Sequence, residues 1–187
     1  MNMFEGQMVR LRAFDNGDLI PLWKSLNDAD VMGLLSGAPV LPATMDDAAQ
    51  FMAAQTSHST GEYQFAIERL EDGRFLGRCG LSELDRRNLR AEVTIHIGEE
   101  EMRGRGYGTD ALSILCRFAF EDLNLHRLKA HVYACNEHSI RCLEKSGFQQ
   151  EGVLKEEMYR FGRWHDVVAY ALMRCEWEAL NERTGED

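Results

Sequence analysis

The sequence predicts a single domain of mixed α and β structure (α+β), and three observations lead to that prediction. Short alternating or apolar runs, separated by turn residues, recur along the chain and are typical of strands. Segments with apolar residues at helical spacing lie between some of them. A strand, a helix and a second strand follow one another between residues 92 and 133, which implies one parallel pair in a mostly antiparallel, twisted sheet flanked by helices.

The first part of the chain should hold one strand and two helices. Val9–Arg12 alternates as a strand does, the residues after Asp15 carry apolar side chains at helical spacing, and Thr44–Asp47 resembles the N-cap of a second helix. Between these helices, Gly33–Pro42 contains two glycines and two prolines and is predicted to be a loop. A flap over a substrate and a plain connector are both open interpretations of it.

A hairpin and a third strand are expected next. Tyr63–Glu68 and Phe75–Leu84 have the composition of strands, and the sequence Glu71–Arg74 between them favours a tight turn. A charged turn, Asp85–Arg90, then leads to a strand at Glu92–Ile97. This part of the sheet is therefore predicted to be antiparallel.

The second half begins with a helix from about Gly108, followed by a strand at Leu128–Tyr133. A further helix is predicted at Glu137–Lys145, and Gly147 suits its C-terminal end.

Two final strands, roughly Gln149–Tyr159 and Asp166–Arg174, should turn at Phe161–Arg163. A polar tail follows from Glu176, with Trp177 anchoring its start. The whole chain, 1–187, is read as one domain with a core of about 9–177 and a polar tail at 178–187.

Composition limits the class of protein. Apolar residues make up 44% and charged residues 28%, which are globular values. The longest apolar run, Val167–Met173, is too short to cross a bilayer, and Met1–Arg12 lacks a secretory signal pattern. Five scattered cysteines without a Cys-x-x-Cys pair fit reduced thiols. A soluble, cytoplasmic protein without membrane contact is the expectation.

The formal net charge of −10 argues against a nucleic-acid-binding protein, because such proteins owe much of their affinity to neutralised phosphates. It favours a cationic partner.

The segment Met102–Thr109 is interpreted as a phosphate cradle. Its glycines, Gly104, Gly106 and Gly108, allow positive φ angles and expose backbone N–H groups, while a helix that begins there adds its own free N–H groups and positive dipole end. Arg103 and Arg105 add charge. A diphosphate would accept hydrogen bonds from these donors. Tyr107 and Thr109 are also counted among the residues that would bind it.

Two observations weigh against that interpretation. A glycine-rich turn with two solvated arginines would have the same sequence. The segment also lacks the Gly-Lys-Ser/Thr ending of an ATP-binding loop, and it is one residue short of the dinucleotide fingerprint.

The pattern Arg103-x-x-Gly106-x-Gly108, followed by a helix, a strand and Asn136–Phe148, resembles the GNAT family of N-acetyltransferases. Downstream, Glu151–Leu154 and Gly162–Asp166 resemble the branch of ribosomal-protein alanine and serine N-acetyltransferases (RimJ/RimL-like). The resemblance covers about Val9 to Trp177. It implies the acyl-CoA N-acyltransferase fold, with a central splay between the fourth and fifth strands.

The resemblance also implies acetyl-CoA as acetyl donor. The pantetheine arm would pair with the exposed edge of Ile95, His96 and Ile97, and the diphosphate would lie on the cradle. Asn136 would hydrogen-bond the pantetheine, although an ordinary helix N-cap is the alternative role. Ser139 and Cys142 follow on the same helix.

The expected reaction is attack of an amine on the thioester carbonyl, with a backbone N–H near the splay stabilising the oxyanion. Glu92 is the leading candidate for a general base, acting directly or through water, and a solvated carboxylate is its alternative interpretation. Glu83 and His96 are weaker candidates. An α-amine of pKa about 8 is roughly a tenth neutral at pH 7, whereas a lysine-like amine is about a thousandth neutral.

The chain departs from the family at Leu143, where many members carry a tyrosine that protonates the leaving thiolate. A thiol leaves fairly well as an anion, so the loss of this acid should slow transfer rather than abolish it. Ser139, Cys142 or water could substitute for the tyrosine. Cys142 is not expected to be a covalent nucleophile.

A metal is not expected, because the spacing of His131, Cys135 and His138 matches no ligand pattern. The run Glu99–Glu101 beside the cradle must face solvent if an anion binds there.

These arguments predict acetyl transfer to a protein N-terminal α-amine by direct attack in a ternary complex. A polyamine or other small amine is the alternative acceptor. A non-catalytic acyl-CoA-binding regulator is the alternative of another class, suggested by Leu143. A homodimer is compatible with the sequence but not indicated by it.

Overall fold

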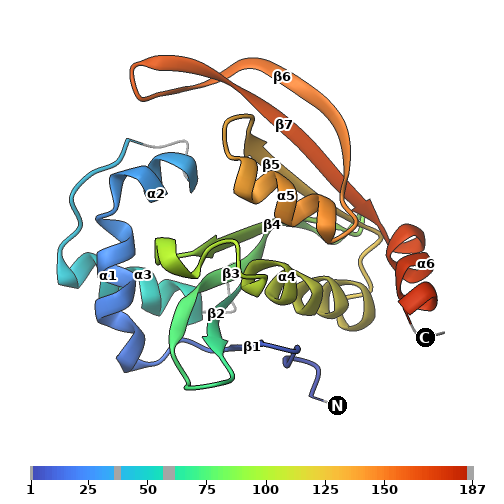
Figure 1. Cartoon of the computed structure of the whole chain (residues 1–187), viewed down its shortest axis with the longest axis horizontal. Coiled ribbons are helices and arrows are strands. Elements are labelled where there is room, and N and C mark those ends of the chain that lie inside the picture. The colour runs from blue at the N-terminus through green and yellow to red at the C-terminus, as the bar shows by residue number, and fades with distance from the viewer. Residues whose placement is uncertain (1, 36–38, 57–61, 185–187) are drawn as a thin grey trace.

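The computed structural model describes residues 2–35, 39–56 and 62–184. Within them one sheet of seven strands runs in the order β1-β2-β3-β4-β5-β7-β6 (Figure 1). The strands are β1 (Val9–Arg12), β2 (Tyr63–Arg69), β3 (Phe75–Asp85), β4 (Arg90–Ile97), β5 (Arg127–Tyr133), β6 (Gln149–Arg160) and β7 (Arg163–Met173).

Helices lie on both faces of this sheet. They are η1 (Asn16–Asp18), α1 (Leu19–Leu26), α2 (Ala29–Leu35), α3 (Met45–Thr56), η3 (Glu100–Met102), α4 (Tyr107–Arg117) with its π-helical continuation η4 (Phe118–Asp122), α5 (Glu137–Lys145) and α6 (Arg174–Thr184). The main core forms where α4 packs on β1, β3 and β4. α1 and α3 lie over the opposite face, where Ser25 contacts His96 and Phe51 lies under Arg78.

The sheet opens between β4 and β5. These strands are parallel and pair only at Arg90, Ala91 and Glu92, which face Arg127, Leu128 and Lys129. Beyond Glu92, β5 pairs along its whole length with β7, while β4 continues to Ile97 beside β3 alone among the described residues. The mixed sheet and the predicted splay between the fourth and fifth strands are therefore confirmed.

The sequence was correct about most elements and wrong about three segments. Gly33 was assigned to a loop but lies inside α2, where a side chain would collide with Phe161: an added Cβ would be 2.6 Å from its ring. The glycine thus serves a contact with the tip of the β6–β7 hairpin and does not make a turn. Residues 36–38 of the predicted loop lie outside the described residues.

The other two corrections concern the C-terminal part. β7 begins at Arg163, three residues earlier than predicted, because Phe161 and Gly162 alone form the turn, both with positive φ (51° and 75°). The expected polar tail is largely the helix α6. Its Trp177 packs on Phe120 with ring centroids 5.3 Å apart, which confirms the predicted anchor.

A buried ion-pair network joins β1 to β2 and η1. Asp18 accepts hydrogen bonds from the Arg12 guanidinium at 2.7 and 2.8 Å. Glu68, which is 6% exposed, accepts from Arg10 at 2.7 Å and also from Arg12. Burial opposes ionisation of Glu68, but the hydrogen bonds and charges of Arg12 and Arg10 outweigh it and hold its pKa below the ordinary 4.5.

This lowered pKa predicts how stability depends on pH. A carboxyl group with a depressed folded-state pKa stabilises the fold above its unfolded-state pKa, and that contribution is lost as the pH falls through the folded-state value. Glu68→Gln should lower the free energy of unfolding by about 1–3 kcal/mol at pH 7, with a smaller difference from the wild type in acid. Urea unfolding of both proteins from neutral pH to below about pH 4 measures this, and a difference independent of pH would contradict it.

Candidate active site

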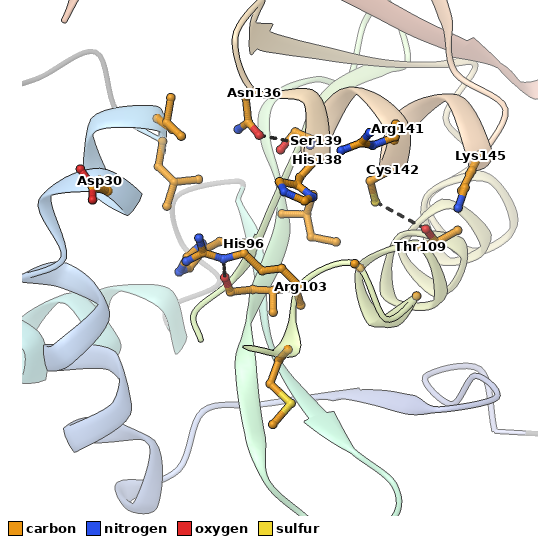
Figure 2. A pocket seen from close by; sticks show the side chains of 18 residues that line it. Asp30, His96, Arg103, Thr109, Asn136, His138, Ser139, Arg141, Cys142 and Lys145 are labelled. Atoms are coloured by element: carbon orange, nitrogen blue, oxygen red, sulfur yellow. Dashed lines mark hydrogen bonds between the residues drawn. The ribbon is translucent and has the colours of Figure 1, made fainter. Parts of the chain in front are cut away.

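A cavity of about 420 Å³ lies where β4 and β5 separate. Its walls come from the end of β4, the glycine-rich loop, one side of α5 and part of α2, and Figure 2 shows these side chains converging on it. The lining residues are Asp30, Leu34, Leu35, Ile95, His96, Ile97, Met102, Arg103, Gly104, Gly106, Gly108, Thr109, Asn136, His138, Ser139, Arg141, Cys142 and Lys145.

The glycine-rich loop has the backbone geometry that the sequence predicted. Gly104 and Gly106 have φ angles of 73° and 94°, and α4 begins directly after them. No N–H group from Gly104 to Thr109 donates to an acceptor within the described part of the chain, and the first one satisfied is that of Asp110, which donates to the Gly106 carbonyl at 3.0 Å. Gly104, Gly106, Gly108 and Thr109 also line the cavity, so free backbone donors lie beside it.

The two arginines of this loop differ from the prediction that both supply charge to an anion. The Arg103 guanidinium donates to the carbonyls of Ile97 at 3.1 Å and Gly98 at 2.7 Å, so it joins the loop to the end of β4. Arg105 is exposed and does not line the cavity, and neither does Tyr107. Ile97, at the end of β4, lies beyond the last residue that pairs with β5, and Arg103 supplies its carbonyl with a donor.

The glutamates beside the loop are placed as predicted. Glu99, Glu100 and Glu101 are all exposed, and Glu99 pairs with Arg74. They do not line the cavity.

Helix α5 supplies the opposite wall. Asn136 caps it by accepting a hydrogen bond from the Ser139 N–H at 3.2 Å, and it also lines the cavity, so its two predicted roles are compatible. Sequence reasoning missed His138, Arg141 and Lys145 as lining residues. Their spacing at i, i+3 and i+7 was the available signal, because side chains so spaced share one helix face.

Cys142 lies where α5 and α4 meet. Thr109 Oγ1 donates to its sulfur at 3.8 Å, and a Cβ added to Gly108 would be 3.4 Å from the same sulfur, so Gly108 permits the close approach of the helices. Burial raises the pKa of the Cys142 thiol despite the hydrogen bond from Thr109. The side chain is therefore a neutral thiol near pH 7, which fits a wall residue better than a nucleophile.

His96 is an unsuitable base in this structure. Its Nε2 lies 2.8 Å from Ser25 Oγ. Burial, together with the charges of Arg78 and Arg103, lowers the pKa of His96 to about 3. A group with so low a pKa holds an abstracted proton weakly at neutral pH.

Glu92 lies at the point where the strands separate, and it does not line the cavity. Its carboxylate contacts His131 Nδ1 at 3.0 Å and Lys129 Nζ at 3.2 Å, and the Glu92 side chain is 18% exposed. Glu83 also pairs with Lys129, at 2.6 Å, but its side chain is 65% exposed. Of these two candidate bases, Glu92 is thus the more enclosed and the better held.

Leu143 is buried in the core beside the cavity and does not line it. The neighbouring Ser139 and Cys142, the side chains considered as substitutes for the missing tyrosine, do line it.

The residues considered as metal ligands do not converge. His131 contacts Glu92, and Cys135 contacts His165. Among the described residues, no three His, Cys, Asp or Glu side chains are placed to hold a metal ion. In that same part of the chain, none of the helices has the length and apolar character needed to span a membrane.

A mixed sheet that opens between two parallel strands, beside a glycine-rich helix N-terminus, defines this chain as a protein of the acyl-CoA acyltransferase architecture. The chain belongs to the GNAT acetyltransferase family: the family profile described as "Acetyltransferase (GNAT) domain" matches residues 9–149.

Relatives of different described activity resemble the chain. A putative ribosomal N-acetyltransferase, YdaF of Bacillus subtilis, is 38% identical over 58% of this chain and 59% of its own length. The [ribosomal protein uS5]-alanine N-acetyltransferase of Escherichia coli is 25% identical over 64% and 62%. The first four curated relatives are matched over only 59–64% of their length.

Among solved structures, the spermidine N-acetyltransferase of Vibrio cholerae in complex with CoA and spermine superposes with a TM-score of 0.80. It is 25% identical, and the match covers 91% of this chain and 98% of that one.

Proposed function

We propose that this protein is an acetyl-CoA-dependent N-acetyltransferase whose acceptor is a protein N-terminal α-amine. The observation that carries the proposal is the cavity at the splay, which brings an unpaired strand edge and a set of free backbone N–H donors to one place. Membership of the GNAT family supports the reaction class.

The donor-binding role follows from the chemistry of the walls. The diphosphate would accept hydrogen bonds from the N–H groups between Gly104 and Thr109, at the positive end of α4. The amides of the pantetheine arm would pair with the free edge of β4 at Ile95–Ile97, as an added strand does. Arg141 and Lys145 add positive charge on the α5 side.

Acetyl-CoA would supply an activated carbonyl, and the chain would supply proton transfer and orientation. Glu92 would take the proton of the attacking amine, directly or through water, with its carboxylate held by Lys129 and His131. A backbone N–H at the splay would stabilise the oxyanion. Ser139, Cys142 or water would return a proton to the leaving thiolate, since Leu143 carries none.

The acceptor assignment rests on charge and on the relatives. A polyamine carries several positive charges, and Asp30 is the one acidic residue on the cavity wall within the described residues, against Arg103, Arg141 and Lys145. An N-terminal α-amine brings a single charge and is partly neutral at pH 7. Two of the relatives are described as ribosomal or ribosomal-protein N-acetyltransferases.

A polyamine is the second candidate acceptor, because the spermidine N-acetyltransferase of Vibrio cholerae matches nearly the whole chain with a TM-score of 0.80. The deciding experiment offers acetyl-CoA with peptides bearing free N-termini, with the same peptides N-terminally blocked but containing lysine, and with spermidine. Mass spectrometry should detect acetylation of the free N-termini first. Faster acetylation of spermidine would overturn the acceptor assignment. Stabilisation by acetyl-CoA without transfer to any acceptor would favour a binding regulator.

Gly106→Val should weaken acetyl-CoA binding by at least about tenfold, or about 1.4 kcal/mol. Gly106 has a φ of 94°, so a β-branched residue would shift the backbone whose N–H groups face the cavity. Gly162→Val is the matched control, because it imposes similar strain (φ 75°) in a turn with no atom within 4 Å of the added Cβ. Isothermal titration calorimetry should show normal binding for Gly162→Val, and equal affinity of both variants would exclude the cradle as the diphosphate site.

Glu92→Gln should lower kcat by about 10²-fold or more while leaving acetyl-CoA affinity nearly unchanged, because general base catalysis contributes about 10²–10⁴-fold. Glu83→Gln provides the comparison: it removes the other carboxylate on Lys129 and should have a smaller effect. Steady-state kinetics across pH test this. The base assignment would be wrong if Glu92→Gln kept full kcat at every pH, or if Glu83→Gln were the slower enzyme.

A further inference from the structure

A cysteine and a histidine lie together at the end of β5, outside the cavity wall. Cys135 is exposed, and its sulfur is 3.7 Å from Nδ1 of His165. His165 belongs to β7 and is only 8% exposed. An accessible thiol is thus in contact with a buried imidazole.

The second ring nitrogen fixes the role of the first. Nε2 of His165 lies 3.1 Å from the carbonyl oxygen of Arg160. A carbonyl oxygen can only accept, so Nε2 carries the hydrogen, and the neutral imidazole presents the lone pair of Nδ1 to Cys135. A nucleophile, a base and a group that orients the base, in this order, are the arrangement that activates cysteine.

The imidazole is also held in place. The rings of Tyr133 and Phe161 stand nearly perpendicular to it, with centroids at 5.9 and 6.3 Å. Cys135 immediately precedes Asn136, the N-cap of α5, and the positive end of a helix favours a thiolate. The two rings hold the imidazole beside the sulfur. The helix N-terminus stabilises the negative charge that forms on the sulfur.

The remaining cysteines lack this combination. Cys79 and Cys116 are fully buried, and burial raises the pKa of both thiols. Cys142 is partly buried on the cavity wall. Cys175 is exposed in the first turn of α6, but it has no hydrogen-bond partner among the residues described. Cys175 is therefore an internal control: it is exposed and lies at a helix N-terminus as Cys135 does, but it has no histidine beside its sulfur among the described residues.

We propose that Cys135 is an activated thiol and a site of covalent modification by disulfides of low-molecular-weight thiols, with His165 as its base. The Cys135 sulfur passes its proton to Nδ1 of His165 and attacks one sulfur of the disulfide. A new S–S bond forms as the old one breaks, and the second sulfur leaves as a thiolate that takes the proton from His165. Cys135 is oxidised and the leaving half of the disulfide is reduced. This inference goes beyond the proposed function and does not depend on it.

The test treats the reduced full-length protein with oxidised glutathione and quantifies the mixed disulfide at each cysteine by peptide mass spectrometry. Cys135 should react at least about tenfold faster than Cys175, a threshold set below the roughly 10²–10⁴-fold that a positioned general base contributes. Equal rates at the two cysteines in the wild-type protein would overturn the proposal without any variant.

His165→Phe keeps a ring between Tyr133 and Phe161 but removes Nδ1. In this variant the rate at Cys135 should fall to within about twofold of the rate at Cys175. The fully buried Cys79 and Cys116 should remain unmodified, which reports that the fold is intact. A folded His165→Phe protein that still reacts fast at Cys135 would also overturn the proposal. Cys135→Ser should lose the fast-reacting site altogether, and a fast reaction that persists would place it on another cysteine.

Discussion

The structure depends on the early end of pairing between β4 and β5. Three residues of each strand pair, and β5 then follows β7. A strand edge left open in this way exposes backbone groups that need partners, and exposed edges are normally paired, covered or blocked. Here the open edge borders a cavity of about 420 Å³. The missing pairs leave a strand edge beside this cavity, and under the proposed function the amides of the pantetheine arm would pair with it.

The loop after β4 is shaped by the same separation. Gly104 and Gly106 have positive φ angles, and the N–H groups of residues 104–109 have no acceptor among the described residues. Arg103 secures the loop by donating to the carbonyls of Ile97 and Gly98. Gly108 lets α4 approach Cys142 on α5. The end of β4 and the glycine-rich loop thus line the same cavity, because only the short segment with η3 separates them in the chain.

Local pattern was enough to predict most of the fold, and it failed where a distant contact decides the outcome. Gly33 reads as a loop residue in isolation, but Phe161, far along the chain, fills the space of its missing side chain inside α2. The backbone geometry of the glycine-rich loop was predictable because it depends on neighbouring glycines. The fold-back of Arg103 and the place of Glu92 away from the cavity wall were not, because they depend on where β4 ends and where β5 leaves it.

The charged residues of the cavity wall are mostly basic, whereas the chain as a whole is acidic. The chain carries a formal charge of −10, yet the cavity wall holds Arg103, Arg141 and Lys145 with Asp30 as its acidic member among the residues described. Local charge, more than the net value, decides what binds in a cleft, because screening limits the reach of distant groups to about 10 Å. A basic wall suits a phosphate-bearing donor, whereas the acidic remainder of the surface favours the approach of a cationic amine.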